Sequence, residues 1–327
     1  MSKNAPILIS VYDRKQHLQR CVDALKCNPE AKNSILYIVS DGWQCEAHRG
    51  AIRDVRSYIK SITGFDEVRT RFRETNLGMA ASGTDAWKWV LEENDSAIKM
   101  EDDIVCSPHF LTFTNEALRT YENDLRVFAV CTHVHPKFRP PEGYNEETFL
   151  WQAFCPWGYG TWKNRIEGLG QHRARGFSEF ADNETWRRFK RCYPIVRRRR
   201  DFLSGNIQND AATLAHVFLT GQYSLFPEDS LSINTGGDGT GSNCALGWTY
   251  PEQRLYDGRP RVVPELRPSE AIARQQYWNH FSVINHVVVP LLIKLGCFEM
   301  LYSMFRHIVG ATRRKEIESH HTGSSVQ

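Results

Sequence analysis

Hydrophobic residues in the first third of the chain follow two different spacings. Short runs with β-branched residues occupy residues 6–12, 35–40, 68–73 and 96–100, and the first two of these are almost entirely apolar. The segments between these runs place apolar side chains at helical intervals, as at Leu18, Cys21, Val22 and Leu25. The runs indicate buried strands, and the intervening segments indicate amphipathic helices. Their alternation predicts an α/β fold with a mostly parallel sheet flanked by helices.

The alternation continues beyond the fourth run and then weakens. The expected later elements are a helix over 108–123, a strand over 127–131, a proline-rich loop at 136–144, an aromatic and glycine-dense segment at 151–162, and helices over 179–193 and 207–219. A glycine-rich loop follows at 234–243. Proline-rich and glycine-rich loops commonly border functional sites, so these loops are candidates for lining one.

Polar residues follow directly where the predicted strands end. Tyr12 ends the first strand, Asp41 follows the second, and the acids Glu101, Asp102 and Asp103 follow the fourth. In open α/β sheets, ligands bind at the carboxyl ends of the strands, where the loops converge. We therefore expect these side chains to lie close together.

The three consecutive acids carry the clearest chemical signal. Adjacent carboxylates repel one another unless a cation lies among them, and Mg²⁺ and Mn²⁺ prefer such oxygen ligands while keeping positions for phosphate oxygens. The alternative is a solvated acidic turn. Their position after a buried strand favours a metal site that binds a diphosphate.

Charge and cysteine content restrict the class of partner. The chain has 41 basic and 38 acidic residues, a net charge of +3, which does not predict a nucleic-acid-binding protein. Its nine cysteines include no Cys-x-x-Cys pair, so they indicate reduced thiols rather than a zinc site or a disulfide framework. The first residues show no secretory signal. We expect a cytoplasmic protein.

Five segments resemble a known family. They are residues 6–14, Asp41-Gly42, Asn76-Leu77-Gly78, 99–103 and the aromatic segment 155–162. In order and spacing they are similar to nucleotide-sugar glycosyltransferases of the GT-A fold, particularly the glycoprotein N-acetylglucosaminyltransferase group and bacterial surface-polysaccharide transferases. The likeness covers about two thirds of the chain and implies a GT-A type, Rossmann-like mixed sheet.

The resemblance assigns roles to individual residues of the donor site. It implies that Ser10, Tyr12 and Arg14 lie beside the nucleotide, that Asp41 faces the base or ribose, and that Asn76 and Gly78 close this site. Asp103 would be the direct ligand of Mn²⁺ or Mg²⁺, with Asp102 near the ribose and Glu101 supporting. The donor would be a nucleotide-diphosphate sugar, against which Trp157 is expected to stack. For Asn76 to Gly78 an ordinary turn is the alternative, and for Trp157 a place in the core.

An inverting transferase also needs a general base for the acceptor hydroxyl. By its place after the aromatic segment and before a helix, Asp210 resembles the family's base, with Asn209 beside it. Capping of the following helix is the alternative for both residues. Asp229 is the reserve candidate. The loop 238–243 is flexible enough to fold over a diphosphate, although Asn243 stands where similar enzymes have a histidine.

Basic and apolar segments in the second half predict contact with a membrane. Arg197–Arg200 and the nearby basic helix are expected to form a locally cationic surface that anionic lipid would attract, with a solvated run of charges as the alternative. Near the C-terminus one helical stripe is apolar, formed by Leu291, Leu295, Phe298, Tyr302, Phe305 and Val309. No uncharged run reaches the roughly 20 residues needed to cross a bilayer. The stripe therefore lies on a membrane or packs on protein.

The predicted protein is a peripheral enzyme on the inner face of the cell membrane that transfers a sugar to a glycan or lipid-linked acceptor. We divide it into a nucleotide-sugar-binding half (1–105), an acceptor-binding half (106–250), a C-terminal helical extension (251–315) and a disordered tail (316–327). Two alternatives stay open: a sugar nucleotidyltransferase, although the first loop at Tyr12 to Lys15 lacks the glycines such enzymes need, and a non-catalytic glycan-binding protein on the same fold.

Overall fold

The first half of the chain builds four parallel strands, as its hydrophobic runs predicted. The computed structural model describes residues 4–194, 198–238, 240, 253–280, 287–297, 300, 301 and 304. Its first strands are β1 (Ile7–Val11), β2 (Ile35–Ser40), β3 (Glu67–Phe72) and β4 (Ser96–Glu101). They lie in the order β3-β2-β1-β4 with every neighbouring pair parallel. β1 and β2 are almost completely buried, as parallel strands covered on both faces must be.

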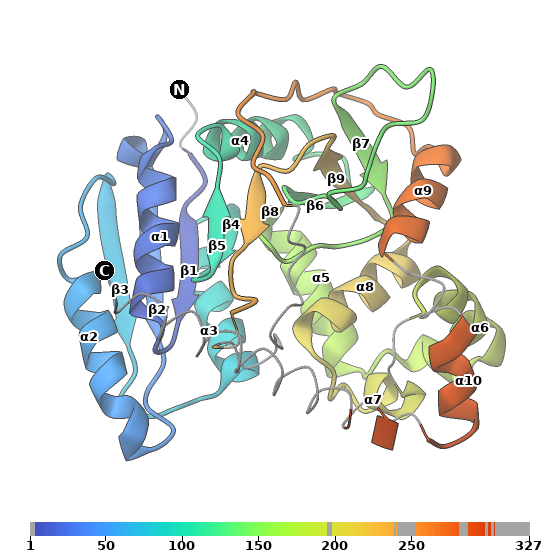
Figure 1. The fold of residues 1–327 in the computed structure, drawn as a ribbon, viewed down its shortest axis with the longest axis horizontal. Coiled ribbons are helices and arrows are strands. Elements are labelled where there is room, and N and C mark those ends of the chain that lie inside the picture. Colours follow the sequence, from blue (N-terminus) through green and yellow to red (C-terminus); the bar gives the residue numbers. More distant parts are fainter. Residues whose placement is uncertain are drawn as a thin grey trace, which may run out of the picture.

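Helices cover both faces of this part of the sheet (Figure 1). α1 (Lys15–Lys26) and α2 (Arg49–Ile59) pack on the face formed by Ile7, Ile9 and Ile38. α3 (Met79–Leu91) packs on the opposite face, which Leu8 and Val39 form. Successive residues of a strand point to opposite faces, so one apolar run supplies both cores.

The second half extends the same sheet to eight strands. β8 (Tyr159–Trp162) lies antiparallel between β4 and β6 (Val127–Cys131), and β9 (Tyr223–Pro227) continues parallel to β6. β7 (Thr148–Trp151) closes the edge antiparallel to β9. With β7 and β8 reversed, the other six of the eight strands run in one direction. The predicted fold class, a mixed and mostly parallel sheet flanked by helices, is confirmed.

Helices between β8 and β9 form an aromatic-rich layer beside the sheet. They are α5 (Lys163–Ala174), the 3-10 helix η3 (Ser178–Ala181), α6 (Asn183–Cys192), α7 (Arg199–Leu203) and α8 (Asn209–Thr220). Phe177, Phe180, Phe189 and Phe202 are fully buried among them. The single helix expected over 179–193 is wrong: the chain breaks at Asp182, whose carboxylate accepts a hydrogen bond from Thr185 N at 2.7 Å and begins α6.

A short two-stranded sheet was not predicted. β5 (Ile104–Cys106) follows the acidic triplet and pairs antiparallel with β10 (Ser232–Asn234). Between β5 and β6 lies α4 (Phe110–Thr120), which packs on the same face as α1. The pairing of β5 with β10 brings the start of the glycine-rich loop to the acids.

The C-terminal extension is described in part. α9 (Glu270–His280) packs near β7, and α10 (Val289–Lys294) exposes Leu291. Phe298, Tyr302, Phe305 and Val309 of the predicted stripe lie outside the described residues, as do Arg197, Asn243 and the tail 316–327. Within the described part of the chain, no helix is long and apolar enough to cross a membrane. The division into halves at residue 105 stays a prediction.

Candidate functional site

The strand order brings the predicted site residues to one edge. β1 lies between β2 and β4, with Ser10 opposite Val39 on one side and Glu101 on the other. Because the strands are parallel, the residues that follow them, including Tyr12, Asp41 and Asp102, emerge at the same carboxyl edge. The grouping that the sequence predicted is therefore present.

Asp102 and Asp103 converge on the guanidinium of Arg14. Arg14 Nη2 lies 3.0 Å from Asp103 Oδ2 and also contacts Asp102 Oδ1, while Arg14 Nε donates to Asp102 Oδ2 at 3.2 Å. The two carboxylate side chains are only 6% and 7% exposed. Burial raises the pKa of Asp102 to about 6, although Arg14 opposes this shift. Both buried carboxylates thus contact the same guanidinium group.

Glu101 and Lys99 lie on β4, directly before Asp102 and Asp103. Glu101 has an exposed surface, yet the protein packed around its carboxylate, together with Asp103, raises its pKa. Burial lowers the pKa of Lys99, although Glu101 and Asp102 oppose this shift. Lys99 Nζ donates a hydrogen bond to Ser10 Oγ. Glu101 is therefore recessed but reachable by solvent, and Ser10 is engaged by a neighbouring lysine.

The loop after β10 holds Asp103 from the other side. Asn234 Nδ2 donates to Asp103 Oδ1 at 3.4 Å, and Thr235 N donates to the Asp103 carbonyl oxygen at 2.8 Å. A Cβ at Gly236 would lie 2.2 Å from Asp103 Oδ2 and 3.2 Å from Arg14 Nη1. Only glycine allows this approach. The sequence indicated a glycine-rich loop here but no individual roles for Asn234, Thr235 or Gly236.

The same loop is attached to the first helix. His17 Nε2 lies 3.1 Å from Asp238 Oδ2, and Asp238 Oδ1 accepts hydrogen bonds from Thr240 N and Oγ1 at 3.0 and 2.7 Å. His17 is buried in the first turns of α1, three residues after Arg14. Asn234 to Asp238 thus connect Asp103 with α1.

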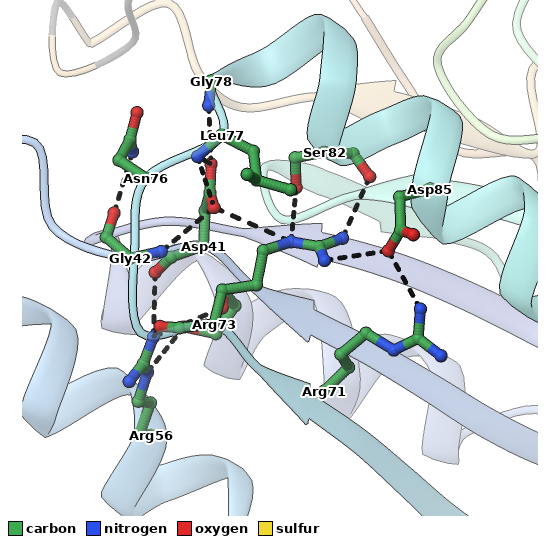
Figure 2. A network of polar contacts seen from close by, with 11 residues as sticks. Asp41, Gly42, Arg56, Arg71, Arg73, Asn76, Leu77, Gly78, Ser82 and Asp85 are labelled. Atoms are coloured by element: carbon green, nitrogen blue, oxygen red, sulfur yellow. Dashed lines mark hydrogen bonds and ion pairs between the residues drawn. The ribbon is translucent and has the colours of Figure 1, made fainter.

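Asp41 organises the turn that follows β3 (Figure 2). Its Oδ1 accepts from Gly42 N and Leu77 N at 3.0 and 3.1 Å, and its Oδ2 accepts from Gly78 N at 3.0 Å. Arg73 Nε lies 3.7 Å from Asp41 Oδ1. The contacts of Asp41 are with this turn, and its contact with a base or ribose stays a prediction.

Two glycines make this turn sterically possible. Gly78 has a φ of 76°, which favours glycine, and a Cβ at Gly42 would lie 2.3 Å from the Thr75 carbonyl carbon. Asn76 Nδ2 donates to the Gly42 carbonyl oxygen at 2.8 Å and joins the two loops. Asp41, Asn76 and Gly78, predicted separately, belong to one structural unit.

Aromatic side chains line the loop after β2. Tyr12 Oη lies 2.8 Å from His48 Nδ1 and accepts a hydrogen bond from Gln44 N at 2.9 Å. The Arg49 guanidinium stacks over the Trp43 ring, 5.0 Å from its centroid. Trp43 and His48 were not predicted; their position soon after the Asp41-Gly42 turn that follows β2 was the available signal.

Asp210 lies in the first turn of α8, exposed to solvent, and its Oδ1 accepts from Ala211 N at 2.8 Å. This bond joins neighbouring residues and is not an N-cap bond; the N-cap of α8 is Gln208, and its side chain makes no cap hydrogen bond. Burial raises the pKa of the Cys155 thiol, and the charges of Cys131, Glu101 and Asp210 add smaller effects in the same direction. The role of Asp210 as the base stays a prediction.

The remaining predicted residues have defined surroundings. Trp157 is half-buried, with its ring edge-on to His133 at a centroid distance of 4.6 Å. Asn209 Oδ1 accepts from Arg173. Asp229 follows β9, three strands away from β4 in the sheet, and lines a small hollow with Glu147. Asp229 is thus placed apart from the acidic triplet.

Metal binding would rely partly on the substrate. Within the residues that the structure describes, no group of three or more His, Cys, Asp or Glu side chains is arranged to hold a metal ion. Asp102 and Asp103 nevertheless share one cation, the Arg14 guanidinium, which marks where a divalent ion would meet both. Mg²⁺ is commonly bound by one or two carboxylates together with water and substrate phosphates. The donor set fits an ion of this kind.

Comparison with known proteins gives no match by sequence: no protein-family model and no curated protein matches the chain. Among solved structures, the chain is similar to the mannosyltransferase PcManGT from Pyrobaculum calidifontis in complex with GDP-Man and Mn²⁺, with 14% identity, 51% of this chain and 46% of that chain covered, and a TM-score of 0.36. It is also similar to TarS of S. aureus, with 13% identity, 45% and 24% coverage, and a TM-score of 0.31. The chain thus covers less than half of either structure.

Proposed function

We propose that the protein is a metal-dependent, inverting glycosyltransferase of the GT-A type. It would move a sugar from a nucleotide-diphosphate donor to a glycan or lipid-linked acceptor in surface polysaccharide synthesis. The observation that carries this proposal is the convergence of two buried carboxylates, Asp102 and Asp103, on one cationic position at the carboxyl edge of the sheet. Such an edge is where α/β proteins bind phosphorylated ligands.

The donor would lie across the ends of β1, β2 and β4. Tyr12, Trp43 and His48 offer ring surfaces for a nucleobase, since bases stack on aromatic side chains. Ser10 and the turn held by Asp41 would border the ribose. Arg14, at the N-cap of α1, would bind the diphosphate, because a helix N-terminus and a guanidinium both favour phosphate oxygens.

The chain's own residues would then divide the chemistry. A bound Mn²⁺ or Mg²⁺ supplies charge neutralisation for the departing diphosphate. Asp103, hydrogen-bonded to Asn234, would hold the ion, and Glu101 and Trp157 would border the sugar. Asp210 accepts the proton of the acceptor hydroxyl, and attack from the face opposite the diphosphate inverts the anomeric carbon. Asp229 is the reserve base.

A membrane would present a lipid-linked acceptor. Five exposed arginines lie on α6, on α7 or at the N-cap of α7: Arg187, Arg188, Arg191, Arg198 and Arg200. The extension exposes Val287, Leu291, Leu295, Met300 and Met304. Cationic and apolar side chains of this kind bind anionic bilayers peripherally. The proposal therefore places the enzyme on the cytoplasmic face of the cell membrane.

A nucleotide-sugar screen tests the function. The full chain is melted with each nucleotide-sugar, with Mn²⁺ or with a chelator, because a ligand of the folded state raises the melting temperature. We expect one donor to stabilise the protein with Mn²⁺ and to be hydrolysed slowly to nucleoside diphosphate. Stabilisation without any turnover would favour a glycan-binding protein, and release of pyrophosphate from a nucleoside triphosphate with a sugar phosphate would favour a nucleotidyltransferase.

A further inference from the structure

Arg14 occupies the place between the two acids that a divalent ion would need. One nitrogen, Nη2, contacts both Asp102 Oδ1 and Asp103 Oδ2, and Nε is bound to the second oxygen of Asp102. Mg²⁺ requires its oxygen ligands at about 2.0–2.1 Å in near-octahedral geometry. An ion cannot approach these oxygens while the guanidinium lies against them, because the two cations would overlap and repel.

The surroundings of Arg14 allow its side chain to leave in one direction. On the side of β10 the space is closed, since even a Cβ on Gly236 would lie 3.2 Å from Arg14 Nη1. The Arg14 side chain is 18% exposed, so its free side faces solvent. Its backbone lies at the N-cap of α1, and the first turn of α1 contains no acidic residue. A displaced guanidinium therefore remains beside the N-terminus of α1, whose amide groups favour anions. A phosphate bound there would lie within reach of Arg14.

We propose that Arg14 is a placeholder that couples metal binding to donor binding. It pairs with Asp102 and Asp103 in the absence of a divalent ion, must leave for the ion to bind, and then pairs with the donor's diphosphate. Since the diphosphate attracts Arg14 away from the acids, donor and metal each increase the affinity of the other. This inference rests on the proposed function, because it requires that Asp102 and Asp103 bind a metal.

The test measures Mn²⁺ binding without nucleotide. Free Mn²⁺ is followed by electron paramagnetic resonance during titration of the wild type, Arg14→Met and Arg14→Lys. Removal of the competing charge should tighten Mn²⁺ binding about tenfold in Arg14→Met, within the usual range of coupling energies. Arg14→Lys keeps a positive charge and should fall between the two. Arg20→Met, an exposed arginine on the same helix, is the matched control and should bind as the wild type does.

A second variant shows where the ion binds. Adding Asp103→Asn to Arg14→Met should abolish the gained Mn²⁺ binding, and binding that persists would overturn the proposal. Because Arg14→Met leaves two buried acids unpaired, its melting temperature should fall in chelator and recover with Mn²⁺. This recovery separates loss of the ion pair from general misfolding.

The outcomes distinguish the inference from the function on which it rests. Equal or weaker Mn²⁺ binding by Arg14→Met, compared with the wild type, overturns the placeholder role and leaves the metal site intact. If neither protein binds Mn²⁺ and the wild type transfers sugar in the presence of chelator, the metal-dependent function fails as well.

Discussion

At the scale of single residues, Asp103 is the most constrained acid of the site. Its carboxylate meets Arg14 and Asn234, and its main-chain oxygen accepts two hydrogen bonds from Thr235. The acids were readable from the sequence because they are consecutive. Asn234 was not, because it lies 131 positions away from Asp103 and reaches it only through a strand pairing of three residues. Local sequence patterns do not report contacts of this separation.

Replacing Asp103 should remove the chemistry and leave the fold. Asp103→Ala deletes the expected metal ligand, so donor turnover should fall about a thousandfold or more, as the loss of several kcal/mol of charge stabilisation would produce. Product release is measured with saturating Mn²⁺, and folding by circular dichroism. Asp54→Ala, at an exposed position of α2, provides the control. Turnover by Asp103→Ala close to that of the control would contradict the assigned role.

Gly236 should tolerate no side chain. In Gly236→Ala the new Cβ would lie 2.2 Å from Asp103 Oδ2, so the carboxylate or the loop must move. Disturbing a residue that orients a metal ligand typically weakens metal affinity about 10–100-fold. Mn²⁺ titrations with donor present measure the loss. Gly170→Ala, inside α5 with nothing within 4 Å of the new Cβ, should bind normally.

At the scale of elements, the sequence predicted those with long, buried patterns. β1, β2 and β4 follow apolar runs, and α1 and α2 follow helical spacing, so both their type and position were correct. β5 and β10 are three residues each, too short for a recognisable alternation. The break before α6 depends on the capping side chain of Asp182. The surrounding basic and aromatic residues continue in a helical pattern across this position, so the break was not recognised. Short elements are fixed by tertiary contacts.

The packing of α5 on α8 should make stability depend on pH. His172 Nδ1 and His216 Nδ1 lie 2.7 Å apart, and both side chains are buried. Burial, with a smaller effect of His172, lowers the pKa of His216 from 6.5 to about 4. Between these values the unfolded chain binds a proton that the folded chain does not, so the free energy of unfolding should fall as pH decreases through this window. The contribution of His216 is about 3 kcal/mol.

Denaturation in urea at several pH values, for the wild type and His216→Gln, measures this contribution. The difference in unfolding free energy between the two proteins should change between pH 7 and pH 4, because only the wild type has the proton-linked penalty at this position. Parallel pH profiles would show that His216 is not the group responsible.

At the scale of the whole molecule, charge on α6 and α7 should direct the protein to membranes. Each exposed arginine near an anionic leaflet contributes about 1 kcal/mol, and salt screens this attraction. Arg187, Arg188 and Arg191 replaced together by Gln should reduce cosedimentation with phosphatidylserine vesicles at least about tenfold. The control replaces Arg20 on α1, Arg53 on α2 and Lys60 at the C-cap of α2, all exposed, with the same change in net charge. Equal losses in both variants would indicate only nonspecific electrostatic attraction.

Because β8 runs opposite to β4, the helices that follow it begin at the edge of the sheet opposite to the acids. β8 begins beside Trp157, at the edge where the acids lie, and its last residue, Trp162, pairs with Ser96 at the opposite edge. The helices α5 to α8 therefore begin at the edge opposite to the acids. The chain returns to the sheet at the same edge, where Tyr223 at the start of β9 pairs with Val127. The helices between β8 and β9, which include the proposed base Asp210 on α8, are thus joined to the sheet at an edge remote from Asp103. A change in the length of these helices or their loops would therefore alter the surroundings of Asp210 without moving Asp102 and Asp103.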